Sequence, residues 1–158
     1  MAKDSKTNAM RILEGMGVAF SHLEYEADEF TDGSHTADRL GLDHEQVFKT
    51  LVTVGADRNH YVFVIPVDES LDLKKCARAV GAKSVTMLPQ KELFPLTGYV
   101  RGGCTAIGMK KRFVTRIDET ASLFDRIYVS AGRIGCQLCL SPDDFCRAAD
   151  ADYADLTE

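Results

Sequence analysis

Residues 47–67 read VFKTLVTVGADRNHYVFVIPV and carry the clearest structural signal in the chain. Two runs rich in β-branched and aromatic residues, 48–54 and 61–67, are separated by a polar turn at 55–60, which is the pattern of a β-hairpin. On either side of this hairpin, further strand-like runs lie at 18–25, 84–88, 112–117, 126–130 and 135–140. Since several runs are neighbours in sequence, as antiparallel pairs require, they predict one mixed sheet and not a doubly wound parallel one.

Helix signals alternate with the strand signals. Ser141-Pro142 followed by two aspartates provides a capping hydroxyl, a proline in the first turn and negative charge at the positive end of the helix dipole. Three other helices are predicted where an apolar stripe is followed by a glycine, at 7–17, 34–40 and 72–80. We therefore expect one α/β domain over residues 1–158, with helices packed on the sheet.

Composition narrows the class of protein. The length of 158 residues suits one domain, and a net charge of −5, from 19 basic and 24 acidic residues, argues against a protein that coats DNA or RNA. The sequence shows neither an export signal nor an apolar run long enough to cross a membrane. The five cysteines are an odd number, so we expect reduced, mostly buried thiols in a cytoplasmic protein.

Lys49 is the most informative single residue. Side chains alternate between the two faces of a strand, which puts Lys49 on the same face as Val47 and Leu51. A lysine among apolar neighbours either extends its ammonium to water or faces a polar cavity that holds a partner for the charge. The pattern alone leaves both interpretations open: an edge-strand lysine, or a cation that binds a carbonyl, carboxylate or phosphate.

Two glycine-rich segments are the second feature. Residues 98–108, GYVRGGCTAIG (the first glycine segment), can adopt positive φ angles and bring backbone N–H groups close to a ligand. The segment is no phosphate-binding P-loop, because Met109 stands where that motif has lysine. It is either a bend between strands or a backbone site for an oxyanion or carboxylate. In residues 128–135 (the second glycine segment), Ser130 is either a turn hydroxyl or a donor in a site.

No metal or cofactor is predicted. Cys136 and Cys139 have the CxxC spacing, but on a strand they point to opposite faces, and no second CxxC or nearby histidine completes a set of ligands. The four histidines are scattered along the chain without a ligand spacing. No Ser-His-Asp arrangement is visible, so nothing in the sequence requires a nucleophile from the protein.

Basic residues gather around the glycine segments. Lys110, Lys111 and Arg112 follow directly after the first segment, Arg101 lies within it, and Arg133 lies in the second. These cations either form a solvated strand end or contact an RNA phosphate backbone, where they would provide orientation and salt-dependent affinity.

The blocks 48–52, 98–112 and 127–135 resemble successive motifs of the YbaK/EbsC family. Members of this family are free-standing Cys-tRNA(Pro) deacylases related to the editing domain of bacterial prolyl-tRNA synthetase. The resemblance covers nearly the whole chain and implies a single α/β domain with a mixed, barrel-like sheet and a substrate cleft. The chain departs from the family pattern at Thr105-Ala106, which replaces a Ser-Pro pair, and at Ile134, where a second basic residue is common.

The predicted site combines the resemblance with the basic residues. The resemblance implies that family activity depends most on Lys49, and that Tyr25 and Phe30 line the aminoacyl pocket. Catalytic roles are expected for Lys49, Gly102, Gly103 and Ser130, and substrate contacts for Tyr25, Phe30, Thr50, Arg101, Lys110 and Arg133.

The resemblance also implies a reaction. The cysteinyl thiol attacks its own ester carbonyl and releases tRNA and a cyclic thiolactone, while Lys49 positions the substrate and glycine N–H groups stabilise the oxyanion. Because the chain is acidic, we expect weak tRNA binding alone and a ternary complex of this protein, mischarged tRNA(Pro) and prolyl-tRNA synthetase. Two alternatives stay open: editing of Ala-, Ser- or Thr-tRNA, and a non-catalytic module that binds tRNA or the synthetase.

Overall fold

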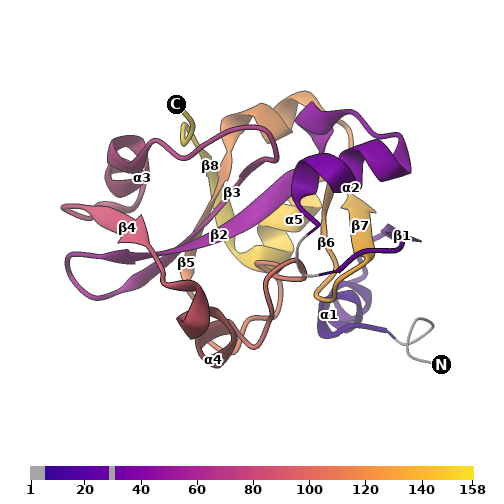
Figure 1. The fold of residues 1–158 in the computed structure, drawn as a ribbon, viewed down its shortest axis with the longest axis horizontal. Coiled ribbons are helices and arrows are strands. Elements are labelled where there is room, and N and C mark those ends of the chain that lie inside the picture. The colour runs from indigo at the N-terminus through magenta and orange to yellow at the C-terminus, as the bar shows by residue number, and fades with distance from the viewer. Residues whose placement is uncertain (1–5, 29–30) are drawn as a thin grey trace.

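The computed structural model describes residues 6–28 and 31–158 and divides the strands between two sheets (Figure 1). A five-stranded mixed sheet has the order β4-β2-β3-β5-β8, and a three-stranded antiparallel sheet has the order β1-β7-β6. The strands are β1 (Ser21–Glu24), β2 (Phe48–Gly55), β3 (His60–Pro66), β4 (Val85–Met87), β5 (Val114–Asp118), β6 (Ile127–Ser130), β7 (Cys136–Leu140) and β8 (Ala151–Ala154). The mixed α/β fold is thus confirmed.

Helices pack around both sheets. The α-helices are α1 (Asn8–Gly15), α2 (Gly33–Leu40), α3 (Leu73–Val80), α4 (Leu93–Thr97) and α5 (Pro142–Ala149), and the 3₁₀-helices are η2 (His44–Gln46), η3 (Gln90–Glu92) and η4 (Glu119–Leu123). The start of α5 follows its sequence signal, because the Ser141 hydroxyl accepts a hydrogen bond from the Asp144 N–H at 3.1 Å. No helix in the described ranges is long and apolar enough to cross a membrane.

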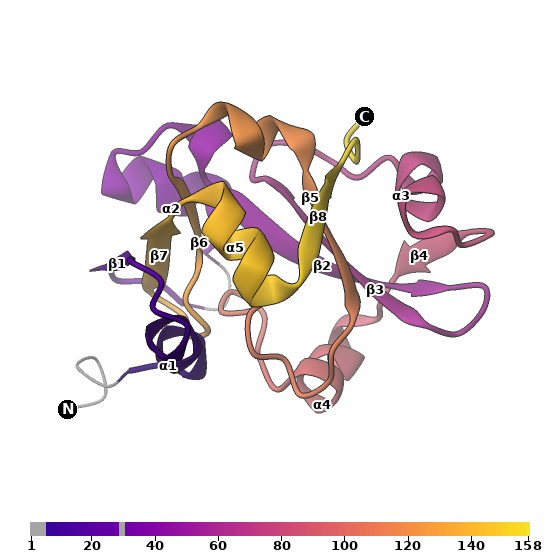
Figure 2. The ribbon, with the colours of Figure 1, turned by 180° about the vertical axis from the view of Figure 1, so that it is seen from behind.

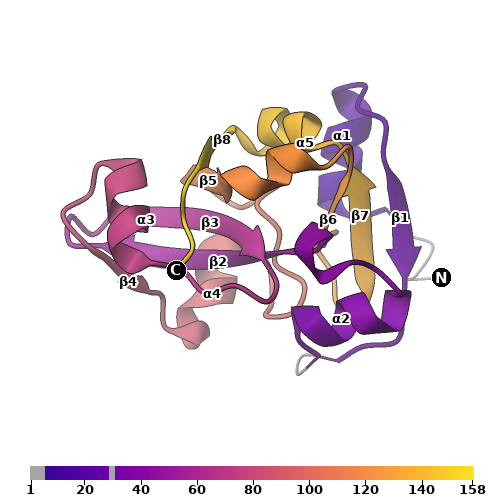
Figure 3. The same cartoon turned by 90° about the horizontal axis from the view of Figure 1, so that it is seen from above.

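The expected barrel-like single sheet is corrected by the structure. In the described part of the chain, the two sheets are joined through a single bridge between Val47 and Tyr128 and do not close into a barrel. Seen from above in Figure 3, β2 and β3 run across the direction of β6 and β7. A closed barrel needs a continuous ladder of hydrogen bonds from strand to strand, and one bridge between strands that run in different directions does not supply it.

The predicted hairpin β2–β3 forms, with Phe48 opposite Pro66 and Val54 opposite His60, so His60 belongs to the strand and not to the turn. Two short elements, α4 and β8, were not predicted. Helix α4 contains a proline within its five residues, and β8 is four residues that pair in parallel with β5. Neither is long enough to show a periodic pattern, so tertiary contacts decide both.

Strand β3 organises the core, because it is buried on both faces. Val62 and Val64 point into a large cluster that includes residues from both sheets, α1 and α5. Phe63 and Ile65 point to the other side, into a cluster that includes Cys76 of α3. Figure 2 shows α5 lying over one side of the sheets, with α1 beside the three-stranded sheet. The shared cluster holds the two sheets together at the junction where the candidate site lies.

Candidate active site

A cavity of about 200 Å³, which we call the Lys49 cavity, lies where β2 has an unpaired edge. Strand β4 pairs only with Thr53–Gly55 of β2, so within the described residues the first half of β2 has no hydrogen-bonded ladder on that side. Lys49 and Thr50 line the cavity there. Ser130 from β6 and Gln137 from β7 form part of the opposite wall, which places the cavity between the two sheets.

Six of the ten predicted site residues line this cavity. They are Tyr25, Lys49, Thr50, Arg101, Gly102 and Ser130. They come from four separate parts of the chain, which the fold brings together. Of the other four, Phe30 lies outside the described residues, and Gly103, Lys110 and Arg133 do not line the cavity.

Gly103 is a packing residue. Its N–H donates to the Val100 carbonyl at 3.0 Å, so this amide is not available to stabilise an oxyanion. A Cβ at this position would lie only 2.9 Å from backbone atoms of Arg133 and Ile134. A side chain would therefore separate the two glycine segments, and glycine is needed for their close approach.

The three cations predicted to contact the substrate all have protein partners. Arg101 lines the cavity and donates to Gln90 Oε1 at 3.0 Å, whereas Lys110 and Arg133 lie outside the cavity lining. The Lys110 ammonium lies 5.4 Å from the centre of the Phe94 ring and 3.4 Å from the Pro95 carbonyl oxygen. The Arg133 guanidinium is 2.6 Å from the Glu24 carboxylate. Lys110 and Arg133 are therefore each held by neighbouring protein groups, and the ion pair with Glu24 offsets the positive charge of Arg133.

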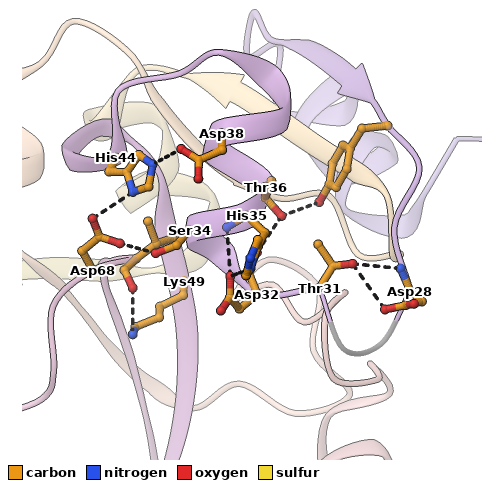
Figure 4. A network of polar contacts seen from close by, with 12 residues as sticks. Asp28, Thr31, Asp32, Ser34, His35, Thr36, Asp38, His44, Lys49 and Asp68 are labelled. Atoms are coloured by element: carbon orange, nitrogen blue, oxygen red, sulfur yellow. Dashed lines mark hydrogen bonds and ion pairs between the residues drawn. The ribbon is translucent and has the colours of Figure 1, made fainter.

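Lys49 is held inward and half-buried. Its ammonium donates to the Val67 carbonyl at 3.0 Å, as Figure 4 shows for the lysine and its surroundings. Burial lowers the pKa of Lys49, although the carboxylates of Asp68, Asp32 and Glu69 act in the opposite direction. An ammonium has three N–H donors, and within the described residues only one of them has an acceptor. Two donors are therefore available to a ligand.

Asp32 is a cavity residue that the sequence analysis did not identify. It caps α2, where its Oδ1 accepts from the His35 N–H at 2.9 Å. This hydrogen bond from the helix backbone lowers the pKa of Asp32, so the wall holds a carboxylate. The sequence does contain a signal, since an aspartate before Gly-Ser-His-Thr is a typical N-cap, although the helix predicted from the apolar stripe begins at Ser34.

Gln137 is the second residue that was missed. It pairs directly with Ser130 in the sheet, and its Nε2 donates to the Tyr25 hydroxyl at 3.3 Å. Its Oε1 is buried and has no hydrogen-bond partner within the described residues. Because a buried carbonyl without a donor is unfavourable, this oxygen is suited to accept from a ligand. The sequence shows only a glutamine within a strand-like CxxC pattern.

The five thiols are free, and four of them are buried, as predicted. Cys104 lines the cavity, but burial raises its pKa to about 12, so it carries a proton at neutral pH and is a poor nucleophile. No group of three or more potential ligand side chains in residues 6–28 and 31–158 is placed to hold a metal ion. Thr105 and Ala106, where the chain departs from the family pattern, are buried and do not line the cavity.

The fold and the cavity described above belong to a protein of the aminoacyl-tRNA editing domain family. Residues 30–148 match the model of that family. This agrees with the resemblance seen in the blocks around Lys49 and the two glycine segments.

Particular relatives are similar over nearly the full length. A protein of Enterococcus faecalis proposed to be the Cys-tRNA(Pro)/Cys-tRNA(Cys) deacylase EbsC is 42% identical, over 96% of this chain and 93% of its own. The crystal structure of a proposed trans-editing enzyme for prolyl-tRNA synthetase has a TM-score of 0.83 and 25% identity, with 98% of this chain and 99% of that chain covered. The hypothetical protein APE2540 has a TM-score of 0.85 at 24% identity, with 94% and 97% covered, which shows a shared fold.

Proposed function

We propose that residues 1–158 act as one editing domain that removes the amino acid from mischarged tRNA(Pro), with Cys-tRNA(Pro) as the preferred substrate. The observation that carries the proposal is the Lys49 cavity, which is lined by an ammonium with unused donors and also by Gly102 and Ser130. Pockets for drug-sized ligands span roughly 300–1,000 Å³, so a cavity of about 200 Å³ suits a single aminoacyl group. The relative from E. faecalis supports the choice of the cysteinyl ester.

The cavity offers no activated nucleophile among its described residues. Cys104 keeps its proton at neutral pH, because burial raises its pKa to about 12. The Ser130 hydroxyl accepts weakly from the Gly132 N–H at 3.4 Å, and no histidine lines the cavity beside it. A hydroxyl without an adjacent base is a weak nucleophile. The attacking group is therefore expected to come from the substrate or from water.

For a cysteinyl ester we infer a substrate-assisted reaction. The thiol sulfur bonds to the ester carbonyl carbon, the bond between that carbon and the ribose oxygen breaks, and the thiol proton ends on the ribose oxygen. The products are tRNA with a free terminal hydroxyl and a cyclic thiolactone. Because the attack is intramolecular, the protein contributes mainly orientation, and an amino acid without a thiol does not react by this route.

Three residues have proposed roles in that orientation. Lys49 directs its two unused N–H donors at the ester and so positions the substrate. The N–H of Gly102, which has no acceptor among the described residues, stabilises the oxyanion; losing such a donor typically costs roughly 10²–10³ in rate. Oδ1 of Asp32 is occupied by His35, which leaves the other oxygen for the substrate's α-ammonium group.

Selection of the tRNA needs a partner in this proposal. The chain has a net charge of −5. The three predicted substrate-binding cations, Arg101, Lys110 and Arg133, are engaged with protein groups, so we expect these cations to add little affinity for phosphates. We propose that prolyl-tRNA synthetase binds the tRNA(Pro) in a ternary complex in the cytoplasm. Sedimentation of this protein with the synthetase, with and without tRNA(Pro), tests this: unchanged sedimentation in both mixtures opposes the partner.

The activity is tested with Cys-, Ala-, Ser- and Pro-tRNA(Pro), by following ester loss above the spontaneous rate. We expect selective loss of the cysteinyl ester, and we expect Lys49→Ala to abolish it. Lys83→Ala is the matched control, since Lys83 is exposed and far along the chain from every cavity residue. Wild-type rates in Lys49→Ala would refute the role of Lys49, and inertness of the wild-type protein toward all four substrates would refute a catalytic function.

A further inference from the structure

A second polar cluster lies beside the Lys49 cavity. His44 in η2 lies between two carboxylates, with Nε2 2.7 Å from Asp38 Oδ1 and Nδ1 2.8 Å from Asp68 Oδ2 (Figure 4). We call this arrangement the His44 bridge. A neutral imidazole has one N–H and one lone pair, so it cannot donate to both carboxylates. The geometry therefore requires the imidazolium form, in which both nitrogens donate.

The His44 bridge is tied to the wall of the cavity. Besides His44, Asp68 accepts from the hydroxyl of Ser34 in the first turn of α2. The neighbouring Gly33 packs so closely on Val67 that a Cβ there would overlap the Val67 side chain. Gly33 and Val67 both line the cavity. The bridge therefore joins α2 to the segment after β3 at the point where both form the cavity wall.

The same segment holds Lys49. The Val67 carbonyl, which accepts from the Lys49 ammonium, belongs to the residue directly before Asp68. The Asp68 carboxylate also raises the pKa of Lys49 against the effect of burial. A movement of Asp68 therefore changes both the position and the charge environment of Lys49.

The surroundings of His44 are acidic. Asp38 faces it from α2, and Asp68 faces it from the segment after β3. The charged groups other than His44 that line the adjoining cavity of about 330 Å³, as far as the structure describes it, are Glu45, Asp68, Glu69 and Asp118. The hydrogen bonds to Asp38 and Asp68 raise the pKa of His44 above its ordinary value of 6.5.

We propose that His44 is a positioning residue, whose imidazolium form ties α2 to the Val67–Asp68 segment and so holds Lys49 in place for deacylation. The inference rests on the proposed function, because it assigns the bridge a role in that reaction. The bridge is complete below about pH 6.5, and it is lost as the pH rises through the raised pKa of His44. Above this pKa, the neutral His44 ring turns a nitrogen lone pair toward one of the two carboxylates. The connection between α2 and the Val67–Asp68 segment is then released.

The first test uses the free protein and needs no tRNA. Isotope-labelled protein is titrated from mildly acidic to alkaline pH, and the His44 ring and Lys49 side-chain resonances are followed by NMR. We expect His44 to titrate above 6.5 and the Lys49 resonances to show an inflection at the same pH. This inflection disappears in His44→Gln and persists in His22→Gln, a matched control on the exposed strand β1. A Lys49 titration that is identical in wild type and His44→Gln overturns the proposal.

The second test is a rescue by Asp38→Asn. An amide at position 38 can donate to the lone pair of neutral His44, so the bridge no longer requires the imidazolium. We expect wild-type kcat/KM, corrected for spontaneous ester hydrolysis, to fall as the pH rises through the His44 pKa. In Asp38→Asn, we expect kcat/KM to persist to higher pH. In His44→Gln, we expect kcat/KM to be reduced by roughly tenfold at the acidic end of the range. A misplacement of 1 Å costs about 10²-fold in rate, so a tenfold loss corresponds to a smaller displacement of Lys49.

The outcomes separate the two proposals. Identical pH profiles of kcat/KM for wild type and Asp38→Asn overturn the role of the bridge. A loss of kcat/KM in His44→Gln that is equal at every pH also overturns it, because a merely structural role of His44 would give such a uniform loss. If the wild-type protein deacylates no substrate, the proposed function fails, and the coupling between the His44 and Lys49 resonances still decides whether the bridge exists.

Discussion

Gly103→Ala tests whether contact between the two glycine segments shapes the active site. The added Cβ would lie 2.9 Å from backbone atoms of Arg133 and Ile134, whereas ordinary contact begins at 3.4 Å. Backbone atoms cannot rotate away as a side chain can, so the two glycine segments must separate by about 0.5 Å. Overpacking of this kind costs about 1–3 kcal/mol in the free energy of unfolding. Displacing reacting groups by 1 Å costs about 10²-fold, so we expect roughly a tenfold loss in the rate of deacylation.

The assay pairs urea unfolding with single-turnover deacylation of Cys-tRNA(Pro). Gly15→Ala is the matched control, because nothing lies within 4 Å of a Cβ at the end of α1. Replacing a helical glycine by alanine stabilises by up to about 1 kcal/mol, and the rate of deacylation should not change. A Gly103→Ala protein as stable and as active as wild type would refute the argument that the close approach of the two segments positions the cavity.

Two further predictions concern the buried amide in the cavity wall. Tyr25→Phe removes the hydroxyl that accepts from Gln137 Nε2 and from the Thr36 hydroxyl. Both ends of the Gln137 amide then lack a partner among the described residues, so unfolding by urea should show a loss of about 1–3 kcal/mol; unchanged stability would contradict a contribution from these hydrogen bonds. Gln137→Met removes the carbonyl that has no partner among the described residues, so stability should hold or rise while KM for Cys-tRNA(Pro) increases. An unchanged KM would mean that this oxygen does not contact the substrate.

Local sequence signals determined most of the secondary structure. The helix starts at Thr7, Asp72 and Ser141 follow from side chains that accept from the first-turn backbone, a contact made within four residues. The hairpin β2–β3 follows from its β-branched runs and polar turn. Such elements can be predicted because the interactions that form them lie close together in sequence.

The site was partly predictable for a different reason. Lys49 is conspicuous because a cation among apolar strand residues needs a partner, and the structure supplies the Val67 carbonyl, 18 residues away. Gly102 and Gly103 were equivalent in the sequence. The structure distinguishes the two glycines, since Gly102 lines the cavity, whereas the N–H of Gly103 donates a hydrogen bond to the Val100 carbonyl. Which glycine is free depends on a turn whose geometry no local pattern specifies.

By itself, the sequence determined a mixed α/β fold and singled out Lys49 and two glycine segments, without deciding whether Lys49 faces solvent or a cavity. Only the tertiary structure decided that two separate sheets, and no barrel, enclose the cavity, and that Asp32 and Gln137 belong to its wall. It also decided that His44 bridges two carboxylates that are six and 24 residues away in the chain. The reason is physical: a periodic pattern reports which face of an element is buried, whereas the partner across a cavity depends on how distant segments pack.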